Sequence, residues 1–226
     1  MKIDIVSIFP EVFEPVFKVG MSRLAQERAL LEINAHDLRD FTTDKHRQVD
    51  DEPYGGGPGM VMKPEPFYQA MLSLLGASPF VVPKGVRTIL LTPQGEPLTQ
   101  SLVSGLAKAE RLIILCGRYE GVDARVNTFV TDEISIGDYI LSGGEIGAMV
   151  IVDAVGRLIS GVLGAEASLD EESFSDGLLE YPQYTRPASW LGQRVPDVLV
   201  SGDHGAIKEW RRREARLRTR TRRPDL

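Results

Sequence analysis

Short apolar runs and longer segments with helical spacing alternate along the first 160 residues of the chain. The short runs are bounded by turn residues and predict β-strands over residues 2–8, 31–36, 87–92, 111–116 and 134–136. The longer segments repeat apolar residues at helical spacing and predict helices over residues 10–17, 22–28, 64–75, 98–106, 122–129 and 144–159. This alternation predicts an α/β domain with a mainly parallel sheet.

Local features add detail to these elements. The strand at 111–116 (RLIILC) is apolar enough to be covered on both faces of the sheet. Pro93-Gln94-Gly95 predicts a tight turn after the strand at 87–92. The helix at 144–159 is apolar nearly all round, which indicates burial against its own sheet and against a second subunit. The helix that opens at Pro10 is expected to turn four side chains inward, namely Val12, Phe13, Val16 and Phe17.

The character of the sequence changes after residue 160. Residues 161–181 are small, acidic and without clean periodicity, which predicts a flexible linker between domains. Residues 182–226 predict a small, mostly helical domain, in which Asp203 caps a helix that runs to about Thr219. That helix is expected to turn Ile207, Trp210 and Leu217 inward. The chain thus divides into residues 1–160, a linker and a C-terminal domain.

Composition and charge narrow the class of protein. The chain has 226 residues with 42% apolar content, and no apolar run approaches the roughly 20 residues of a membrane helix. Its first ten residues enter a strand pattern rather than a signal peptide, so we expect a cytoplasmic protein. Cys116 is the single cysteine, which excludes an intrachain disulfide, and a buried structural role is favoured over a reactive thiol.

Charge is segregated along the chain, whose net charge is −6. Residues 208–223 hold nine basic side chains against two glutamates, whereas residues 166–180 hold six carboxylates and no base. An arginine-rich end of this kind gives a local field that suits phosphate, although a solvated helix face is an equal alternative for any single arginine.

Two glycine-rich segments are candidates for chemistry. Residues 115–145 hold five glycines and two tyrosines between apolar runs, which indicates a pocket built from backbone. Residues 54–60 (YGGGPGM) lie in a long polar connection and predict either a flexible turn or a substrate-facing loop. Neither segment completes a phosphate-binding P-loop or the GxGxxG fingerprint of dinucleotide-binding folds. Asp50 precedes YGGGPGM and is either solvated or an acceptor for a base edge.

Several motifs, taken in order, resemble one family. They are VDDEPYGGGPGM, LLTPQG, LCGRYEGVD, SIGDYILSGGE, DAVGR, DGLLEYPQYTRP and RRPDL. Together they resemble the bacterial tRNA (guanine-N1)-methyltransferases of the SPOUT class, which methylate the guanine at position 37, just 3′ of the anticodon, and the resemblance covers the whole chain. It implies an α/β domain with a deep trefoil knot, an exception to the rule that chains avoid knots. It also implies a small C-terminal domain and a homodimer whose active sites are shared between chains.

The resemblance also implies a cofactor site. S-adenosylmethionine is expected to lie against residues that follow three predicted strands: Leu91, Pro93, Gly117, Tyr119, Glu120, Gly121, Ile136, Gly137, Tyr139, Leu141, Gly143 and Gly144. This agrees with a backbone-built pocket, because glycine N–H and C=O groups can bond an adenine edge while aliphatic side chains cover its faces.

The catalytic residues follow from the chemistry and from the resemblance. N1 of guanine carries a proton at neutral pH, so methyl transfer requires a base within hydrogen-bond reach. Charge that develops on O6 is stabilised by a cation. The family's linker aspartate and knot-helix arginine match Glu172 and Arg157, with Ser168 nearby. Because glutamate replaces the usual aspartate here, Asp176 is the alternative base.

Recognition of tRNA is expected from two parts of the chain. The rim of the guanine pocket and the phosphate contacts are assigned to Asp50, Tyr54, Gly57, Gly59, Arg211, Arg213 and Arg216. Three scattered histidines predict no structural metal, while the family implies a possible Mg²⁺ requirement. Two alternatives stay open: a knotted methyltransferase that acts on another RNA nucleotide, and a non-catalytic RNA-binding relative.

Overall fold

The computed structural model describes residues 1–162 and 172–226, which belong to two compact units. The first unit runs from Met1 to Gly164 and the second from Ala165 to Leu226. None of the helices within the described residues has both the length and the apolar character needed to cross a membrane.

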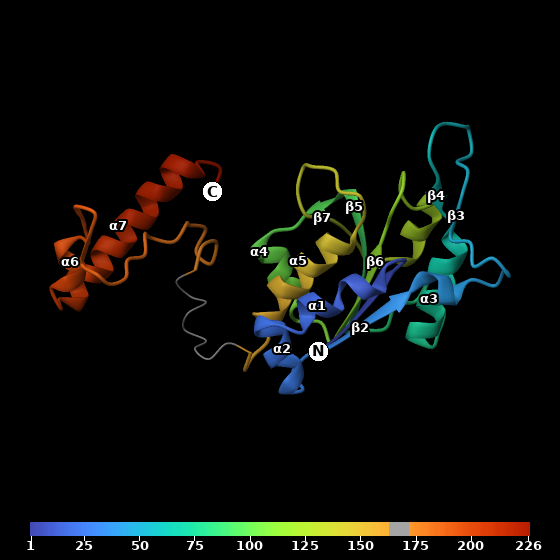
Figure 1. The fold of residues 1–226 in the computed structure, drawn as a ribbon, viewed down its shortest axis with the longest axis horizontal. Helices are drawn as coiled ribbons and strands as arrows, with labels where there is room; N and C mark the ends of the chain where they lie inside the picture. The colour runs from blue at the N-terminus through green and yellow to red at the C-terminus, as the bar shows by residue number, and fades with distance from the viewer. Residues whose placement is uncertain (163–171) are drawn as a thin grey trace. The chain divides into compact units, whose positions relative to one another are not determined.

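A parallel sheet of five strands forms the centre of the first unit (Figure 1). Its strands lie in the order β2 (Glu32–Asp37), β1 (Lys2–Ser7), β6 (Arg111–Cys116), β5 (Val86–Pro97) and β7 (Asp132–Ser135). Every pairing in this sheet is parallel. The prediction of an α/β fold with a mainly parallel sheet is therefore confirmed.

Helices cover both faces of this sheet (Figure 1). The first core cluster packs one face against α1 (Glu14–Phe17), α2 (Gly20–Glu27), α4 (Gln100–Leu106) and α5 (Glu145–Gly156). The second packs the other face against α3 (Pro64–Leu75) and the short 3-10 helices η2 (Leu38–Phe41) and η3 (Ala124–Phe129). Alternate residues of β6 enter the two clusters, so this strand is buried on both faces as its composition predicts.

Two local predictions in the first unit are wrong. A 3-10 turn, η1 (Pro10–Val12), precedes α1, so Phe13 and Phe17 are buried while Val12 and Val16 are exposed. Pro93-Gln94-Gly95 does not end its strand, because β5 continues to Pro97. The chain does leave the ladder at this point, since Leu91 and Glu96 both pair with Ile134. A Cβ on Gly95 would lie 2.4 Å from the backbone nitrogen of Ile134, so close packing on β7 requires glycine there.

A buried carboxylate ties three neighbouring strands together. Asp4 of β1 is fully buried and accepts a hydrogen bond of 2.7 Å from Nε of Arg111 in β6. Nε2 of His36 in β2 lies 2.8 Å from its other oxygen. Burial by itself would raise the pKa of Asp4, but the hydrogen bonds with His36 and Arg111 hold that pKa below its ordinary value. The Asp4 carboxylate thus links β1 to both of its neighbouring strands, β2 and β6.

The second unit contains a short hairpin and two helices. The hairpin joins β8 (Ser189–Trp190) to β9 (Gln193–Arg194), and α6 (Asp197–Val200) precedes α7 (His204–Arg222). Asp203 caps α7 as predicted, since its side chain accepts a 3.0 Å hydrogen bond from the Ala206 amide. Trp210 is buried as expected, but Leu217 is exposed, and Ala215 and Thr219 occupy the buried face instead.

Candidate active site

A cavity of about 580 Å³ opens beside the ends of β5, β6 and β7. All twelve residues predicted to hold S-adenosylmethionine line it, together with other residues of the same loops. They come from the irregular part of β5, from the segment after β6 and from the segment after β7. Segments that are far apart in the sequence therefore meet here because the carboxyl ends of parallel strands share one edge of the sheet.

The two loops that follow β6 and β7 touch each other through backbone. Arg118 and Gly143 form an isolated antiparallel bridge, and the Gly144 amide donates a 2.9 Å hydrogen bond to the Gly117 carbonyl. A Cβ on Gly144 would lie 2.9 Å from Cα of Cys116, so only glycine permits this approach. We call residues 117–121 the β6 loop and residues 136–144 the β7 loop.

Tyrosines lie partly exposed on both loops. Tyr119 is 51% exposed and has a φ of 59°, a left-handed conformation that is unusual for a side chain of this size. Tyr139 is 56% exposed, and its hydroxyl donates a 3.0 Å hydrogen bond to the Ile136 carbonyl. Both tyrosines thus line the cavity with side chains that are about half exposed.

The β6 loop is also joined to the segment that contains YGGGPGM. That segment lies between β3 (Asp50–Asp51) and β4 (Val61–Met62), which pair as a small antiparallel hairpin. The Glu120 amide donates to the Met60 carbonyl at 3.0 Å, and the Met62 amide donates to the Gly121 carbonyl at 2.9 Å. The hairpin and the β7 loop extend at the same end of the sheet (Figure 1).

The predicted substrate residues of this hairpin differ in their surroundings. Asp50 pairs with Met62 at the base of the hairpin, and Tyr54 is 99% exposed near its tip. A Cβ on Gly57 would meet no atom within 4 Å among the described residues, whereas one on Gly59 would lie 2.4 Å from Oε1 of Glu120. Only Gly59 of these four is therefore packed against a residue of the cavity wall.

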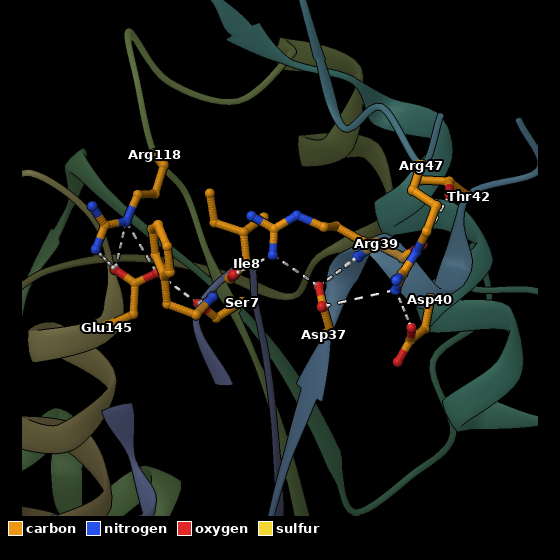
Figure 2. Close-up of polar contacts among 10 residues, drawn as sticks. Ser7, Ile8, Asp37, Arg39, Asp40, Thr42, Arg47, Arg118 and Glu145 are labelled. Atoms are coloured by element: carbon orange, nitrogen blue, oxygen red, sulfur yellow. Dashed lines mark hydrogen bonds and ion pairs between the residues drawn. The ribbon is translucent and has the colours of Figure 1, made fainter. Parts of the chain in front are cut away.

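The chain before this hairpin is held by ionic contacts (Figure 2). The Asp37 carboxylate accepts a 2.9 Å hydrogen bond from the Arg39 amide and begins η2. The Arg39 guanidinium donates to the Ile8 carbonyl at 2.6 Å, and Arg47 pairs with Asp40. These contacts fix residues 37–47 to the end of β1, next to the strand that precedes the β6 loop.

Arg157 is not among the residues that line this cavity. Arg157 follows the last residue of α5, the end of the helix opposite Gly144. Glu172 and Asp176 belong to the second unit, where residues 172–178 form a turn closed by the Phe174 amide on the Leu178 carbonyl at 2.7 Å. Asp176 is exposed and Glu172 is partly buried. Ser168 lies outside the described residues.

The arginines of α7 divide into two groups. Arg213 and Arg216, both predicted to bind tRNA, line a shallow groove together with Glu209, Arg212, Leu217 and Arg220. The Arg211 guanidinium instead lies 4.7 Å from the centre of the Tyr181 ring. Arg213 and Arg216 therefore present positive charge on one side of the helix, while Arg211 packs within its own unit.

Comparison with known proteins identifies the family. The family model described as tRNA (Guanine-1)-methyltransferase TrmD matches residues 1–226. The chain belongs to this family. A tRNA (guanine-N(1)-)-methyltransferase of Dictyoglomus turgidum is 56% identical, over all of this chain and 89% of its own length. The corresponding proteins of Geobacillus kaustophilus and Frankia alni are 54% and 53% identical, again over the whole chain, and are covered over 91% and 84% of their lengths.

One feature of this member of the TrmD family was not found by sequence reasoning. Glu145, the first residue of α5, is 3% exposed and accepts hydrogen bonds from Ser7 and Arg118 (Figure 2). A carboxylate directly after Gly143-Gly144 can be seen in the sequence, but its burial cannot. Cys116 lies close by, and burial together with the Glu145 carboxylate raises the pKa of its thiol well above the ordinary value. The thiol is therefore a poor nucleophile.

No group of three or more His, Cys, Asp or Glu side chains with the geometry of a metal site occurs within residues 1–162 and 172–226.

Proposed function

We propose that this chain transfers a methyl group from S-adenosylmethionine to N1 of the guanine at position 37 of tRNA. The observation that carries the proposal is the match of the TrmD family model to the whole chain, together with relatives of that name at 53–56% identity. The cavity adds independent support, because the residues that the resemblance assigned to the cofactor line one space. We also propose that the reaction takes place in the cytoplasm.

The cavity fits S-adenosylmethionine in size and in the chemistry of its lining. Its volume of about 580 Å³ is within the range of ligand pockets, roughly 300–1,000 Å³. Glycine backbone from both loops offers hydrogen-bond donors and acceptors, while Leu91, Ile136 and Leu141 offer apolar contact. When bound, the cofactor supplies an electrophilic methyl group on a sulfonium. The chain's own part is to orient that methyl toward guanine and to exclude water from it.

The proton on guanine N1 is proposed to pass to a carboxylate of the second unit. Glu172 is the proposed base, and Asp176, which is exposed four residues later, is the alternative. The Arg157 guanidinium is proposed to stabilise the charge that develops on O6. Ser168 is assigned to the same site by the resemblance.

A homodimer is proposed for two reasons. Ile146 and Val150 lie one turn apart on α5 and are 56% and 40% exposed, although this helix is otherwise largely buried. Arg157 is about 20 Å along the helix axis from Gly144, by the rise of an α-helix. An arginine at that end of α5 is better placed to serve a partner's cavity than its own.

The proposal extends to topology and to tRNA recognition. A trefoil knot is proposed from the resemblance, and the Arg118–Gly143 bridge brings together the two loops that such a knot would contain. The second unit is proposed as the tRNA-binding domain, with Arg213 and Arg216 on phosphates and the Arg211 contribution indirect. Tyr54, Gly57, Gly59 and Asp50 are proposed to receive the guanine.

Single-turnover methyl transfer to an unmodified tRNA transcript with guanine at position 37 tests the function. We expect 1-methylguanosine at that position, identified by nuclease digestion and mass spectrometry. A transcript with adenine at position 37 serves as the control and should stay unmodified. Methylation of a ribose, or no product at saturating cofactor, would contradict the proposal. Repeating the assay with EDTA in place of Mg²⁺ tests the metal requirement.

The base is tested by two isosteric variants. Glu172→Gln should lower the rate of methyl transfer by roughly 10²–10⁴, the range for loss of a general base. Asp176→Asn should leave the rate within about threefold. If Asp176→Asn abolishes transfer while Glu172→Gln retains it, the assignment reverses. Cofactor affinity measured by calorimetry should be unchanged in both, which separates a chemical defect from a binding defect.

A further inference from the structure

Glu145 is a buried carboxylate whose environment differs from that of the surrounding core. Its side chain is 4% exposed, yet it begins a helix that is otherwise almost entirely apolar. A charged group in such a position is costly unless it is paired and hydrogen-bonded. The Glu145 carboxylate is both hydrogen-bonded, to Ser7, and paired with a cation, Arg118.

Three elements converge on this carboxylate (Figure 2). The Ser7 hydroxyl, at the end of β1, donates to Oε1 at 2.6 Å. The Arg118 guanidinium, in the β6 loop, donates from Nε to both carboxylate oxygens at 3.2 and 3.1 Å, and its Nη2 lies 3.1 Å from Oε2. Glu145 itself directly follows the β7 loop. The carboxylate therefore joins the two loops of the cavity to the sheet.

The partners of Glu145 are themselves held in place. The Ser7 oxygen accepts a 2.9 Å hydrogen bond from the Phe9 amide, so its proton is directed to the carboxylate. The Arg118 guanidinium lies 4.5 Å from the centre of the Phe9 ring, which covers it by a cation–π contact. A Cβ on Gly143 would lie 2.5 Å from both Nε of Arg118 and Oε2 of Glu145. The Arg118–Glu145 pair therefore passes directly beneath the β7 loop.

Arg118 connects the buried Glu145 carboxylate to the cavity. It lines the cavity wall, while Glu145 is not among the described residues that do so. Its backbone bridges to Gly143, so the side-chain pair with Glu145 runs alongside a backbone contact between the same two loops. Loss of the carboxylate would free the guanidinium to turn into the cavity and would leave the loops joined by backbone alone.

We propose that Glu145, anchored by Ser7 and paired with Arg118, is a positioning residue that sets the spacing of the β6 and β7 loops for S-adenosylmethionine. The inference rests on the proposed function, since it assigns that cofactor to the cavity. It predicts that Glu145 acts on cofactor affinity and leaves the chemical step and tRNA affinity alone.

The test uses Glu145→Gln, Ser7→Ala and the double variant in the full-length protein. Titration calorimetry with S-adenosylmethionine should show that Glu145→Gln weakens binding at least tenfold and Ser7→Ala at least about threefold. The double variant should be no weaker than Glu145→Gln, because both changes act through one contact. In methyl transfer, KM for the cofactor should rise in parallel, while kcat and KM for tRNA stay within about twofold.

Met71→Ala is the matched control for a purely structural effect. Met71 is fully buried in α3, in the core cluster on the other face of the sheet from α5. The Met71→Ala variant should lower the melting temperature at least as much as Glu145→Gln does, and its affinity for S-adenosylmethionine should be unchanged.

Three results would overturn the inference, and one of them separates it from the proposed function. If Met71→Ala weakens cofactor binding as much as Glu145→Gln at equal loss of melting temperature, Glu145 acts through stability alone. If Glu145→Gln and Ser7→Ala bind like wild type, the positioning role fails while the function stands. If the wild-type protein itself binds no S-adenosylmethionine, the proposed function fails first and the inference with it.

Discussion

Glycines of the two glycine-rich segments of this protein serve two different purposes. In the segment 54–60, Gly55, Gly56 and Gly57 have positive φ, and a Cβ added to any of them would meet no described atom within 4 Å. In the loops around the cavity, a Cβ on Gly144 would collide with the backbone of Cys116. Gly55, Gly56 and Gly57 are thus needed for backbone conformation, whereas Gly144 is needed for close packing. A glycine-rich sequence by itself does not distinguish these two uses.

The largest effect on stability and cofactor affinity is expected from Gly144→Ala, which adds a methyl group where Gly144 packs against Cys116. The new methyl group must displace backbone, so we expect a loss of about 1–3 kcal/mol in the free energy of unfolding. Cofactor affinity should fall at least about tenfold, measured by calorimetry.

Gly56→Ala is the matched control from the open segment. Its φ of 75° makes alanine unfavourable by about 1–2 kcal/mol, but no described atom is displaced. Cofactor affinity should therefore stay as in wild type. Equal loss of cofactor affinity in the two variants would remove the distinction between the segments.

Gly59→Ala tests the place where the two segments meet. Its Cβ would lie 2.4 Å from Oε1 of Glu120, so the Glu120 side chain must move. We expect unfolding to become easier by about 1–2 kcal/mol, of which part comes from the φ of 84°. In a Glu120→Ala background only the conformational part should remain. Additive losses in the double-mutant cycle would show that Gly59 is not packed on Glu120 in solution.

Tyr54→Ala should affect tRNA binding without affecting the fold. Its side chain is 99% exposed, so the free energy of unfolding should change by less than about 0.5 kcal/mol. If the ring stacks on a base, tRNA affinity should fall by about 1 kcal/mol, the lower end for such contacts. Tyr54→Phe keeps the ring and should retain affinity. The affinity of both variants for tRNA is measured by filter binding at one fixed salt concentration. If Tyr54→Ala and Tyr54→Phe bind tRNA equally well, the Tyr54 ring does not stack on a base.

Asp4, in the sheet that carries both segments, is expected to have the smallest effect on stability near neutral pH. The pKa of Asp4 is lowered from its ordinary 3.8, so its stabilising contribution is fully present above pH 3.8. That contribution is lost as the pH falls through the lower folded-state pKa. Between pH 5 and pH 7 this group should change nothing.

Asp4→Asn provides the comparison for that pH profile. Urea unfolding of the variant should show a weaker dependence on pH below 4 than the wild type does. Parallel curves for the two proteins would mean that other groups cause the acid sensitivity.

Local patterns in the sequence were enough to predict much of the fold. The strand at 111–116 and the helix at 64–75 have the predicted bounds, because continuous apolar runs and an opening proline are local signals. The failures lie where tertiary contacts override the local signal. Pro93-Gln94-Gly95 lies where the chain leaves the ladder, but the strand does not end there, because β7 pairs again with Glu96 and Pro97.

The candidate site could be predicted only in part. The glycines and tyrosines of residues 117–144 form a conspicuous cluster, and the family resemblance assigned them to one ligand. The burial of Glu145 and the contact between Gly59 and Glu120 depend on which strands lie side by side. No sequence spacing encodes that neighbourhood, since 138 residues separate Glu145 from Ser7.

The sequence by itself determined the alternation of strands and helices, the segregation of arginines into α7 and the family. Hydrophobic periodicity and charge are properties of short stretches, and family motifs are strings of residues, so each can be read without coordinates. Only the tertiary structure decided which glycines are packed and which are open. It also decided that a carboxylate after Gly144 is buried, because burial follows from the strand order that brings Ser7, Arg118 and Glu145 together.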